Sequence, residues 1–297
     1  MNSECELRVL SIQSHVVSGY VGNKSATFPL QLLGFEVDTI NSVQLSNHTG
    51  YKVTKGDILD DINLRKLIDG LVANNLHYYS HLLTGYVGSP SFLDEIVKLI
   101  PILKEKNPKL CFLCDPVMGD DGKLYVPKEL VEIYKNKVVP LADILTPNQF
   151  ELELLTDCKI ITLNDAKVAI EKLHRQGPKT IVVSSIDIEN KLTTIVSESS
   201  DKNMIKIDIP KIPITYTGSG DLFASLFLAH YTLQNNLKYA LECTINTLHS
   251  ILSNTLEYGS AIKDETVQAA RKKELRLIQN KKIIENPPTL FKAEILT

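Results

Sequence analysis

One stretch of the chain decides its fold: YYSHLLTGYVGSPSFLDEIVKLIPILKEKNPKLCFLCDP, residues 78–116. It opens with an apolar segment at 78–83 and a glycine-containing loop, and it continues with apolar residues at helical spacing over 91–106. A second short apolar segment at 109–113 ends in Asp115-Pro116. Short apolar runs bounded by turn residues are typical of buried strands, whereas an apolar period of three to four residues indicates a helix. The stretch therefore predicts a strand–helix–strand unit.

The same alternation recurs along the rest of the chain. Further strand-like runs occupy residues 8–12, 35–43, 142–145 and 180–184. Helical spacing marks residues 127–134, 163–176, 221–235 and 237–256. Residues 192–198 and 203–210 alternate and are expected to form a hairpin-like pair. Repeated units of this kind predict a three-layer α/β/α fold, in which a mostly parallel sheet carries helices on both faces. Because no linker or fixed-period repeat divides the sequence, residues 1–297 are expected to form a single domain.

Composition narrows the classes of partner. The net charge of −3 gives no support to a nucleic-acid or anionic-membrane partner. The N-terminus, MNSECE, has two acids and no apolar segment, so it does not resemble a signal peptide, and no apolar run reaches the ~18–20 residues of a membrane span. The five cysteines are scattered, which favours a reducing compartment. We expect a cytoplasmic protein that binds neither nucleic acid nor membrane.

The sharpest motif is Thr217-Gly218-Ser219-Gly220-Asp221, directly before an apolar helix predicted from Leu222. Two glycines let the backbone approach a ligand closely, and the free N–H groups of a helix start favour an anion. Asp221 has two interpretations. It could be the N-cap of the helix, a frequent role of aspartate. It could instead remove a proton from an alcohol while the amides stabilise a phosphoryl group. This segment alone leaves both open.

Two other loops carry candidate ligands. Asp115 follows a buried strand, where it could hold Mg²⁺ or a monovalent ion, or simply cap a turn. The segment Thr146-Pro147-Asn148-Gln149-Phe150-Glu151 joins a strand to a helix. Asn148 and Glu151 would project near phosphates, directly or through a metal-bound water, and Glu151 would also balance the helix dipole. Cys111 and Cys114 form a Cys-x-x-Cys pair with no second pair, so zinc is not predicted there.

The N-terminal region contains a false signal. Gly19-Tyr20-Val21-Gly22-Asn23-Lys24-Ser25 lacks the contiguous Gly-Lys-Ser/Thr of a P-loop, because Asn23 separates Gly22 from Lys24. A dinucleotide fingerprint is also missing after the first strand-like run. His15 and His48 have no metal-ligand spacing around them, so neither is predicted to bind a metal.

Taken together, these loops resemble the pyridoxal kinases of the ribokinase-like superfamily. The matching segments, in order, are 9–16, 19–23, 26–31, 41–44, 46–51, 83–86, 114–117, 146–151 and 218–223. The similarity runs from about Cys5 to the segment 274–287, nearly the whole chain. Several ordered motifs are far more specific than any one of them.

The resemblance implies roles by position. The implied substrate-binding residues are Ser14, Val43, Thr49, Tyr86 and Asp221. The implied ATP-binding residues are Asp115, Asn148, Glu151, Ser184, Ser185, Tyr125, Thr217 and Ser219. Asp115, Thr146 and Glu151 are the implied metal site, for Mg²⁺ or Zn²⁺ with K⁺ or Na⁺ as a monovalent ion. Gly218, Ser219 and Gly220 would form an anion hole, and Asp221 would be the base toward a 5′-hydroxymethyl group. A homodimer is also implied.

The implied activity is ATP-dependent phosphorylation of pyridoxal, pyridoxine and pyridoxamine in vitamin B6 salvage. Two features depart from the family pattern: Ser219 stands where threonine is usual, and the loop 119–125 is shorter than in some relatives. Two alternatives remain. One is a hydroxymethylpyrimidine kinase, which shares the Gly-x-Gly-Asp motif. The other is a catalytically silent protein that binds pyridoxal phosphate.

Overall fold

A central sheet organises the chain, as a computed structural model of residues 7–188 and 191–296 shows. Its strand order is β12-β11-β10-β9-β8-β5-β4-β1-β2-β3. The strands are β1 (Arg8–Val16), β2 (Glu36–Leu45), β3 (Gly56–Ile58), β4 (His81–Thr84), β5 (Cys111–Cys114), β8 (Ile144–Leu145), β9 (Thr180–Ile188), β10 (Lys191–Glu198), β11 (Ile205–Pro210) and β12 (Glu294–Ile295). From β2 to β9 neighbouring strands are parallel, whereas β3, β10, β11 and β12 pair antiparallel at the two edges. The expected mostly parallel sheet is confirmed, and so is the antiparallel pairing of β10 with β11.

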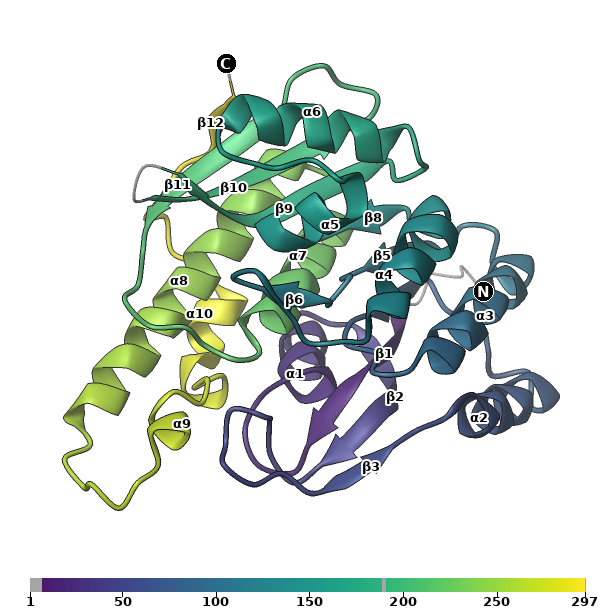
Figure 1. The fold of residues 1–297 in the computed structure, drawn as a ribbon, viewed down its shortest axis with the longest axis horizontal. Coiled ribbons are helices and arrows are strands. Elements are labelled where there is room, and N and C mark those ends of the chain that lie inside the picture. The colour runs from purple at the N-terminus through teal and green to yellow at the C-terminus, as the bar shows by residue number, and fades with distance from the viewer. Residues whose placement is uncertain (1–6, 189–190, 297) are drawn as a thin grey trace.

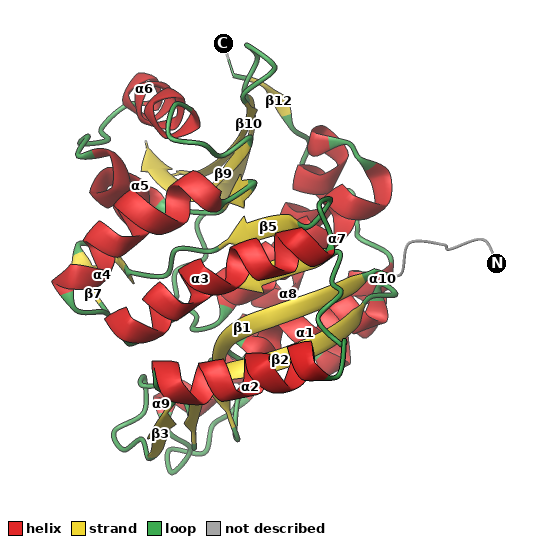
Figure 2. Ribbon diagram, turned by 90° about the vertical axis from the view of Figure 1, so that its right-hand side faces the viewer, coloured by secondary structure: helices red, strands yellow, loops and turns green. Residues whose placement is uncertain are grey.

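Helices cover both faces of this sheet (Figures 1 and 2). They are α1 (Asn23–Leu32), α2 (Asp61–Ala73), α3 (Pro90–Lys106), α4 (Lys128–Ile133), α5 (Gln149–Thr156), α6 (Leu163–His174), α7 (Ser219–Gln234), α8 (Leu237–Ala261), α9 (Ala269–Lys272) and α10 (Lys281–Glu285). Helices α2 to α6 pack on one face and α1, α7 and α8 on the other. A separate two-stranded hairpin, β6 (Gly119–Asp120) with β7 (Lys123–Leu124), projects beyond β5. The architecture is the expected three-layer α/β/α fold.

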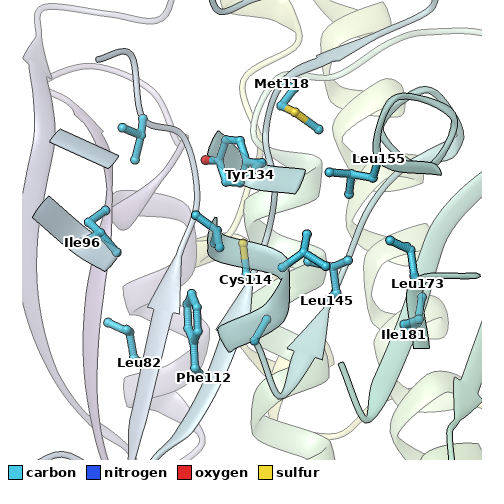
Figure 3. Packing of buried hydrophobic residues seen from close by; sticks show 14 of the residues in the cluster. Leu82, Ile96, Phe112, Cys114, Met118, Tyr134, Leu145, Leu155, Leu173 and Ile181 are labelled. Carbon is cyan, nitrogen blue, oxygen red and sulfur yellow. The ribbon is translucent and has the colours of Figure 1, made fainter. Parts of the chain in front are cut away.

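The strands are apolar on both sides because each sheet face has its own core. Leu82 and Phe112 belong to the cluster under α2 to α6, whereas their neighbours Leu83 and Leu113 belong to the cluster under α1, α7 and α8. Successive side chains of a strand point to opposite faces, so a run such as Phe112-Leu113 supplies both cores. Figure 3 shows part of the first cluster, with Ile96 of α3 lying over the strands. The strands are therefore buried on both faces, which explains why they are continuous apolar runs in the sequence.

Several boundaries differ from the predicted ones. The first strand runs on to Val16, and the strand predicted from Tyr78 begins only at His81. The helix predicted over 127–134 ends at Ile133 and continues as a π-helical turn. Helices α1 and α2 were not predicted: α1 contains Pro29 and begins without a side-chain cap, so it lacks the usual start signals.

Two absences concern the described residues only. Within residues 7–188 and 191–296, no helix combines the length and apolar composition needed to cross a bilayer. The described cysteines Cys111, Cys114, Cys158 and Cys243 are all free, and Cys5 lies outside the described residues.

Candidate active site

The candidate site residues gather where the parallel strands end. Strands β1, β4, β5 and β8 all run in the same direction, so their carboxyl ends share one edge of the sheet. Tyr86 follows β4, Asp115 follows β5 and Thr146 follows β8. Ser14 lies near the carboxyl end of β1. The first turn of α7 faces the same edge, as shown by the contacts below.

The motif at 217–221 forms the start of α7 itself. Helix α7 begins at Ser219, three residues before the predicted Leu222, so the expectation that the whole motif precedes the helix is wrong. Gly218 is the N-cap with φ of +87°, and a Cβ there would lie 2.2 Å from the Tyr20 carbonyl oxygen. Only glycine meets both conditions at low cost. The Ser219 hydroxyl donates to the Tyr216 carbonyl over 3.2 Å. The first N–H groups of a helix have no partner within the helix, so those at the start of α7 can bind a ligand.

Asp221 is not the cap of this helix. The N-cap, Gly218, has no side-chain cap bond, and Asp221 lies in the first turn. Its Oδ2 accepts the backbone N–H of Gly22 at 2.7 Å. Burial raises the pKa of Asp221, while the Gly22 N–H lowers it in part. No hydrogen bond to Oδ1 is found within the described part of the chain, so one oxygen is held and the other is available to a ligand.

Asp115 carries a buried carboxylate oxygen without a partner. The residue is 5% exposed. Its Oδ1 accepts the Thr146 hydroxyl at 3.2 Å, whereas Oδ2 has no hydrogen-bond partner among the described residues. A Cβ placed on Gly220 would be 3.8 Å from Oδ2, so this oxygen faces the start of α7. Burial, followed by the charges of Glu151 and Asp221, raises the pKa of Asp115 well above its ordinary value. Among the described residues no backbone N–H donates to either side-chain oxygen, so the alternative that the side chain caps a turn is wrong.

Glu151 and Asn148 lock two loops together. Asn148 Oδ1 accepts the Glu151 N–H at 2.8 Å, and Glu151 Oε2 accepts the Asn148 N–H at 2.8 Å, which completes a capping box on α5. Glu151 Oε1 accepts the Met118 N–H at 2.9 Å, and Asn148 Nδ2 donates to the Gly119 carbonyl at 2.8 Å. Burial raises the pKa of Glu151 to about 8, although the N–H of Asn148 lowers it. Since both carboxylate oxygens are engaged, contact with a metal through water fits this geometry better than direct ligation.

A bulge aligns the implied substrate residues. The register of β1 and β2 shifts between Gln13 and Ser14, so that Ser14 pairs with Val43 and Ser42 is the extra residue. The Ser42 hydroxyl donates to the Tyr86 carbonyl at 2.7 Å. Val43 is buried, and Tyr86 is half-buried with its ring against the core under α2 to α6. The bulge therefore links the Ser14–Val43 pair to the Tyr86 loop. Ser42 was missed by the sequence analysis, since nothing local marks an extra residue in a strand.

The other residues that the resemblance implies lie on the turn at Thr49, on β9 and beside the β6–β7 hairpin. Thr49 is exposed on a turn, and a Cβ on the adjacent Gly50 would be 3.9 Å from Thr217 Oγ1, so this turn approaches the start of α7. Ser184 and Ser185 lie on β9, where the Ser184 N–H donates to the Pro147 carbonyl at 2.9 Å. Tyr125 is exposed beside the β6–β7 hairpin.

The candidate metal ligand of this site is the carboxylate of Asp115. Across the described residues, no group of three or more His, Cys, Asp or Glu side chains is arranged to hold a metal ion. His48 instead contacts Glu274, with Nε2 3.3 Å from Oε1. An oxygen site of one or two carboxylates is nevertheless what Mg²⁺ requires when substrate phosphates complete its coordination. The unpartnered Oδ2 of Asp115 fits such an ion.

Known proteins are similar to this chain in sequence. Residues 79–265 match the family model described as phosphomethylpyrimidine kinase. The pyridoxal kinase of Arabidopsis thaliana is 52% identical, over 97% of this chain and 94% of its own length. That of Homo sapiens is 46% identical over the full length of both chains.

Solved structures point to the same group. Pyridoxal kinase from Leishmania donovani, in complex with ADP and pyridoxamine, superposes with a TM-score of 0.91 at 35% identity, covering 98% of this chain and all of the other. The same enzyme with ADP alone gives a TM-score of 0.90 at 34% identity and the same coverage. From its sequence, its ribokinase-like fold and the residues at its strand ends, the chain belongs to the pyridoxal kinase family.

Proposed function

We propose that the chain transfers the γ-phosphoryl group of ATP to the 5′-hydroxymethyl group of pyridoxal, with Asp221 as the base. The observation that carries this proposal is the Asp221 carboxylate, which Gly22 fixes through Oδ2, which has no hydrogen bond to Oδ1 among the described residues, and whose charge acts on the nearby Asp115. A primary alcohol is a weak nucleophile and gains from a positioned proton acceptor. The Leishmania donovani enzyme solved with ADP and pyridoxamine supports the same pairing of substrates here.

The start of α7 would hold the transferring phosphoryl group. The amides of Gly218, Ser219 and Gly220 belong to the first turn, where backbone N–H groups have no partner within the helix. Such groups favour an anion and neutralise charge that spreads over phosphoryl oxygens in the transition state. The proposal gives these three residues the role of the anion hole.

Asp115 would hold the cation that accompanies ATP. Its Oδ2 is buried without a partner among the described residues, which is costly for an isolated carboxylate and favours a bound positive charge. Thr146 fixes Oδ1, and Glu151 would act through water. When bound, Mg²⁺ would screen the charge of the phosphates. We also propose, from the family resemblance, a monovalent K⁺ or Na⁺ near this site and tolerance of Zn²⁺ in place of Mg²⁺.

The remaining roles are those that the resemblance to the pyridoxal kinases implies. Tyr86 would pack against the pyridine ring, and Ser14, Val43 and Thr49 would contact the ring substituents. Asn148, Ser184, Ser185, Tyr125 and Thr217 would contact ATP. We further propose that residues 1–297 form one kinase domain that works as a homodimer in the cytoplasm. Sedimentation of the purified chain at micromolar concentration tests the dimer.

The decisive experiment is a kinase assay on the purified chain. Pyridoxal, pyridoxine, pyridoxamine and hydroxymethylpyrimidine are each supplied with ATP and Mg²⁺, and the phosphorylated products are measured. Preferred turnover of a B6 vitamer supports the proposal. Preferred turnover of the pyrimidine would establish the rival kinase instead. Absence of turnover, together with tight binding of pyridoxal phosphate, would establish the catalytically silent protein. Repeating the assay with Zn²⁺, K⁺ and Na⁺ identifies the ions.

A further inference from the structure

A buried glutamate near the C-terminus joins two loops of the candidate site. Glu274 follows α9 and is 9% exposed. Its Oε1 accepts the Tyr51 hydroxyl at 2.9 Å and lies 3.3 Å from His48 Nε2. Its Oε2 accepts the Tyr20 backbone N–H at 3.1 Å. One carboxylate therefore contacts both the loop 46–55, between β2 and β3, and the loop 17–22, between β1 and α1. Figure 1 shows the loop after β2 on the same side of the molecule as α9.

The surroundings of Glu274 are built to receive an ionised carboxylate. A Cβ on Gly19, whose φ is +99°, would lie 2.4 Å from both carboxylate oxygens, so the carboxylate occupies space that any larger residue would need. The Gly50 N–H donates to His48 Nδ1 at 3.1 Å, which leaves the ring proton on Nε2, facing Glu274. Burial alone would raise the pKa of Glu274, but the contacts with His48, Tyr51 and the Tyr20 N–H lower it overall.

Each loop leads directly to a residue of the proposed reaction. In the loop 46–55, His48 precedes Thr49, and the neighbouring Gly50 approaches Thr217. In the loop 17–22, Tyr20 is two residues before Gly22, whose N–H holds Asp221 at 2.7 Å. The Tyr20 carbonyl also packs against Gly218, where a Cβ would be 2.2 Å away. The carboxylate is thus separated by one or two residues from both the substrate turn and the support of the base.

We propose that Glu274 is a positioning residue, which fixes the substrate turn at Thr49 relative to the Gly22 support of Asp221. The proposal rests on the roles given above to Thr49 and Asp221. Glu274 itself touches neither substrate nor base. It acts by holding two loops at a set separation, from positions that are 223 and 254 residues away in the sequence. Loss of the carboxylate frees both loops, whereas loss of the Tyr51 hydroxyl frees mainly the substrate turn.

Steady-state kinetics separates these two effects. For Glu274→Ala we expect about a tenfold rise in the pyridoxal KM and about a tenfold fall in kcat, since displacements of an ångström cost this much or more. The ATP KM should rise clearly less than the pyridoxal KM, because the loops held by Glu274 carry no residue placed on the ATP side and only approach Thr217 and Gly218. Tyr51→Phe should raise the pyridoxal KM and change kcat less. Glu257→Ala, an exposed glutamate of α8, is the matched control and should leave all three constants unchanged. Equal losses in the pyridoxal and ATP KM of Glu274→Ala would overturn the proposal in favour of general destabilisation.

Hydrogen exchange gives a readout that does not need activity. In Glu274→Ala, the amides of residues 46–55 and 17–22 should exchange faster, while those of β4 and β5 should not change. In Tyr51→Phe, faster exchange should be confined to residues 46–55. Unchanged exchange in both loops would refute the positioning role whatever the wild-type chain phosphorylates. If exchange changes as expected but the wild type shows no kinase activity, the proposed function fails and the mechanical link between the loops stands.

Discussion

The Gly22 backbone N–H donates to Oδ2 of Asp221 over 2.7 Å, which ties the β1–α1 loop to the first turn of α7. This bond fixes the position of the carboxylate through Oδ2. Among the described residues Oδ1 has no hydrogen bond, so it stays available to accept a proton. It also explains why a half-buried aspartate is tolerated there: the N–H offsets part of the cost of burying its charge. Because an asparagine at position 221 could accept the same N–H, the role of Asp221 as the base can be tested with a substitution of nearly the same shape.

Asp221→Asn should abolish proton transfer while keeping this bond. The amide oxygen can still accept the Gly22 N–H, so the fold should be retained and Tm should not fall. We expect kcat to fall by at least about 10²-fold, the scale of a lost general base, with little change in the pyridoxal KM. Asp221→Ala should show the same loss of kcat. Near wild-type turnover of either variant would refute the assignment of Asp221 as the base.

Asp115→Asn should stabilise the ligand-free chain and weaken its response to Mg²⁺. Replacing a buried carboxylate that has an unpartnered oxygen with a neutral amide removes an uncompensated charge. A gain of the order of 1 kcal/mol corresponds to a Tm rise of about 1.5–2 °C for a chain of this size. Melting in EDTA, and again with Mg²⁺ and ADP, measures both effects. Asp69→Asn, on the exposed face of α2, is the control. If Mg²⁺ and ADP raise the Tm of Asp115→Asn as much as that of the wild type, Asp115 does not hold the cation.

The sequence predicted the sheet better than it predicted the site geometry. Buried strands such as Phe112-Leu113 are recognisable because both faces require apolar side chains, and the loops after them must lie at one edge. The partners of the site residues are not recognisable in the same way. Gly22 and Asp221 are 199 residues apart, and the bulge at Ser42 depends on pairing between strands. The start of α7 was misplaced because Gly218 caps it through a left-handed backbone rather than through a side chain.

Tyr86→Ala should raise the KM for pyridoxal and leave the KM for ATP unchanged. The ring is half-buried against the core, and the Ser42 hydroxyl anchors its backbone, so it offers a fixed aromatic face. Loss of an aromatic contact of about 0.5–1.5 kcal/mol corresponds to roughly a two- to twelvefold rise in KM. Tyr86→Phe keeps the face and should stay near wild type. An unchanged KM for Tyr86→Ala would count against stacking on the substrate ring.

The chain should lose stability in acid through a buried histidine remote from the strand ends. Burial lowers the pKa of His81 from 6.5 to about 4, and its ring contacts Ser80 Oγ at 2.8 Å and Thr232 Oγ1 at 3.0 Å. The unfolded chain binds a proton near pH 6.5 and the folded chain only near pH 4, so stability is present above this window and is lost as the pH falls through it.

Denaturant unfolding between pH 7 and pH 4 measures this loss. The contribution of His81 is a slope of up to about 1.4 kcal/mol per pH unit. His81→Gln removes the titrating ring and should flatten the dependence, leaving a part from His230, whose pKa burial also lowers to about 4. An identical slope in the wild type and in His81→Gln would show that His81 is not the source.

Ser219→Thr should leave catalysis nearly unchanged, although it restores the residue that the family usually carries. The Ser219 hydroxyl donates to the Tyr216 carbonyl over 3.2 Å, and a threonine hydroxyl can make the same bond. The backbone N–H, which would contact the phosphoryl group, is the same in both residues. The added methyl group lies at a half-exposed position, where substitutions typically change free energies by less than about 0.5 kcal/mol, or about twofold in a rate. The measurement is kcat and the ATP KM for both forms. A change of more than about tenfold in either constant would mean that the side chain itself, rather than the amide, sets the geometry of the anion hole.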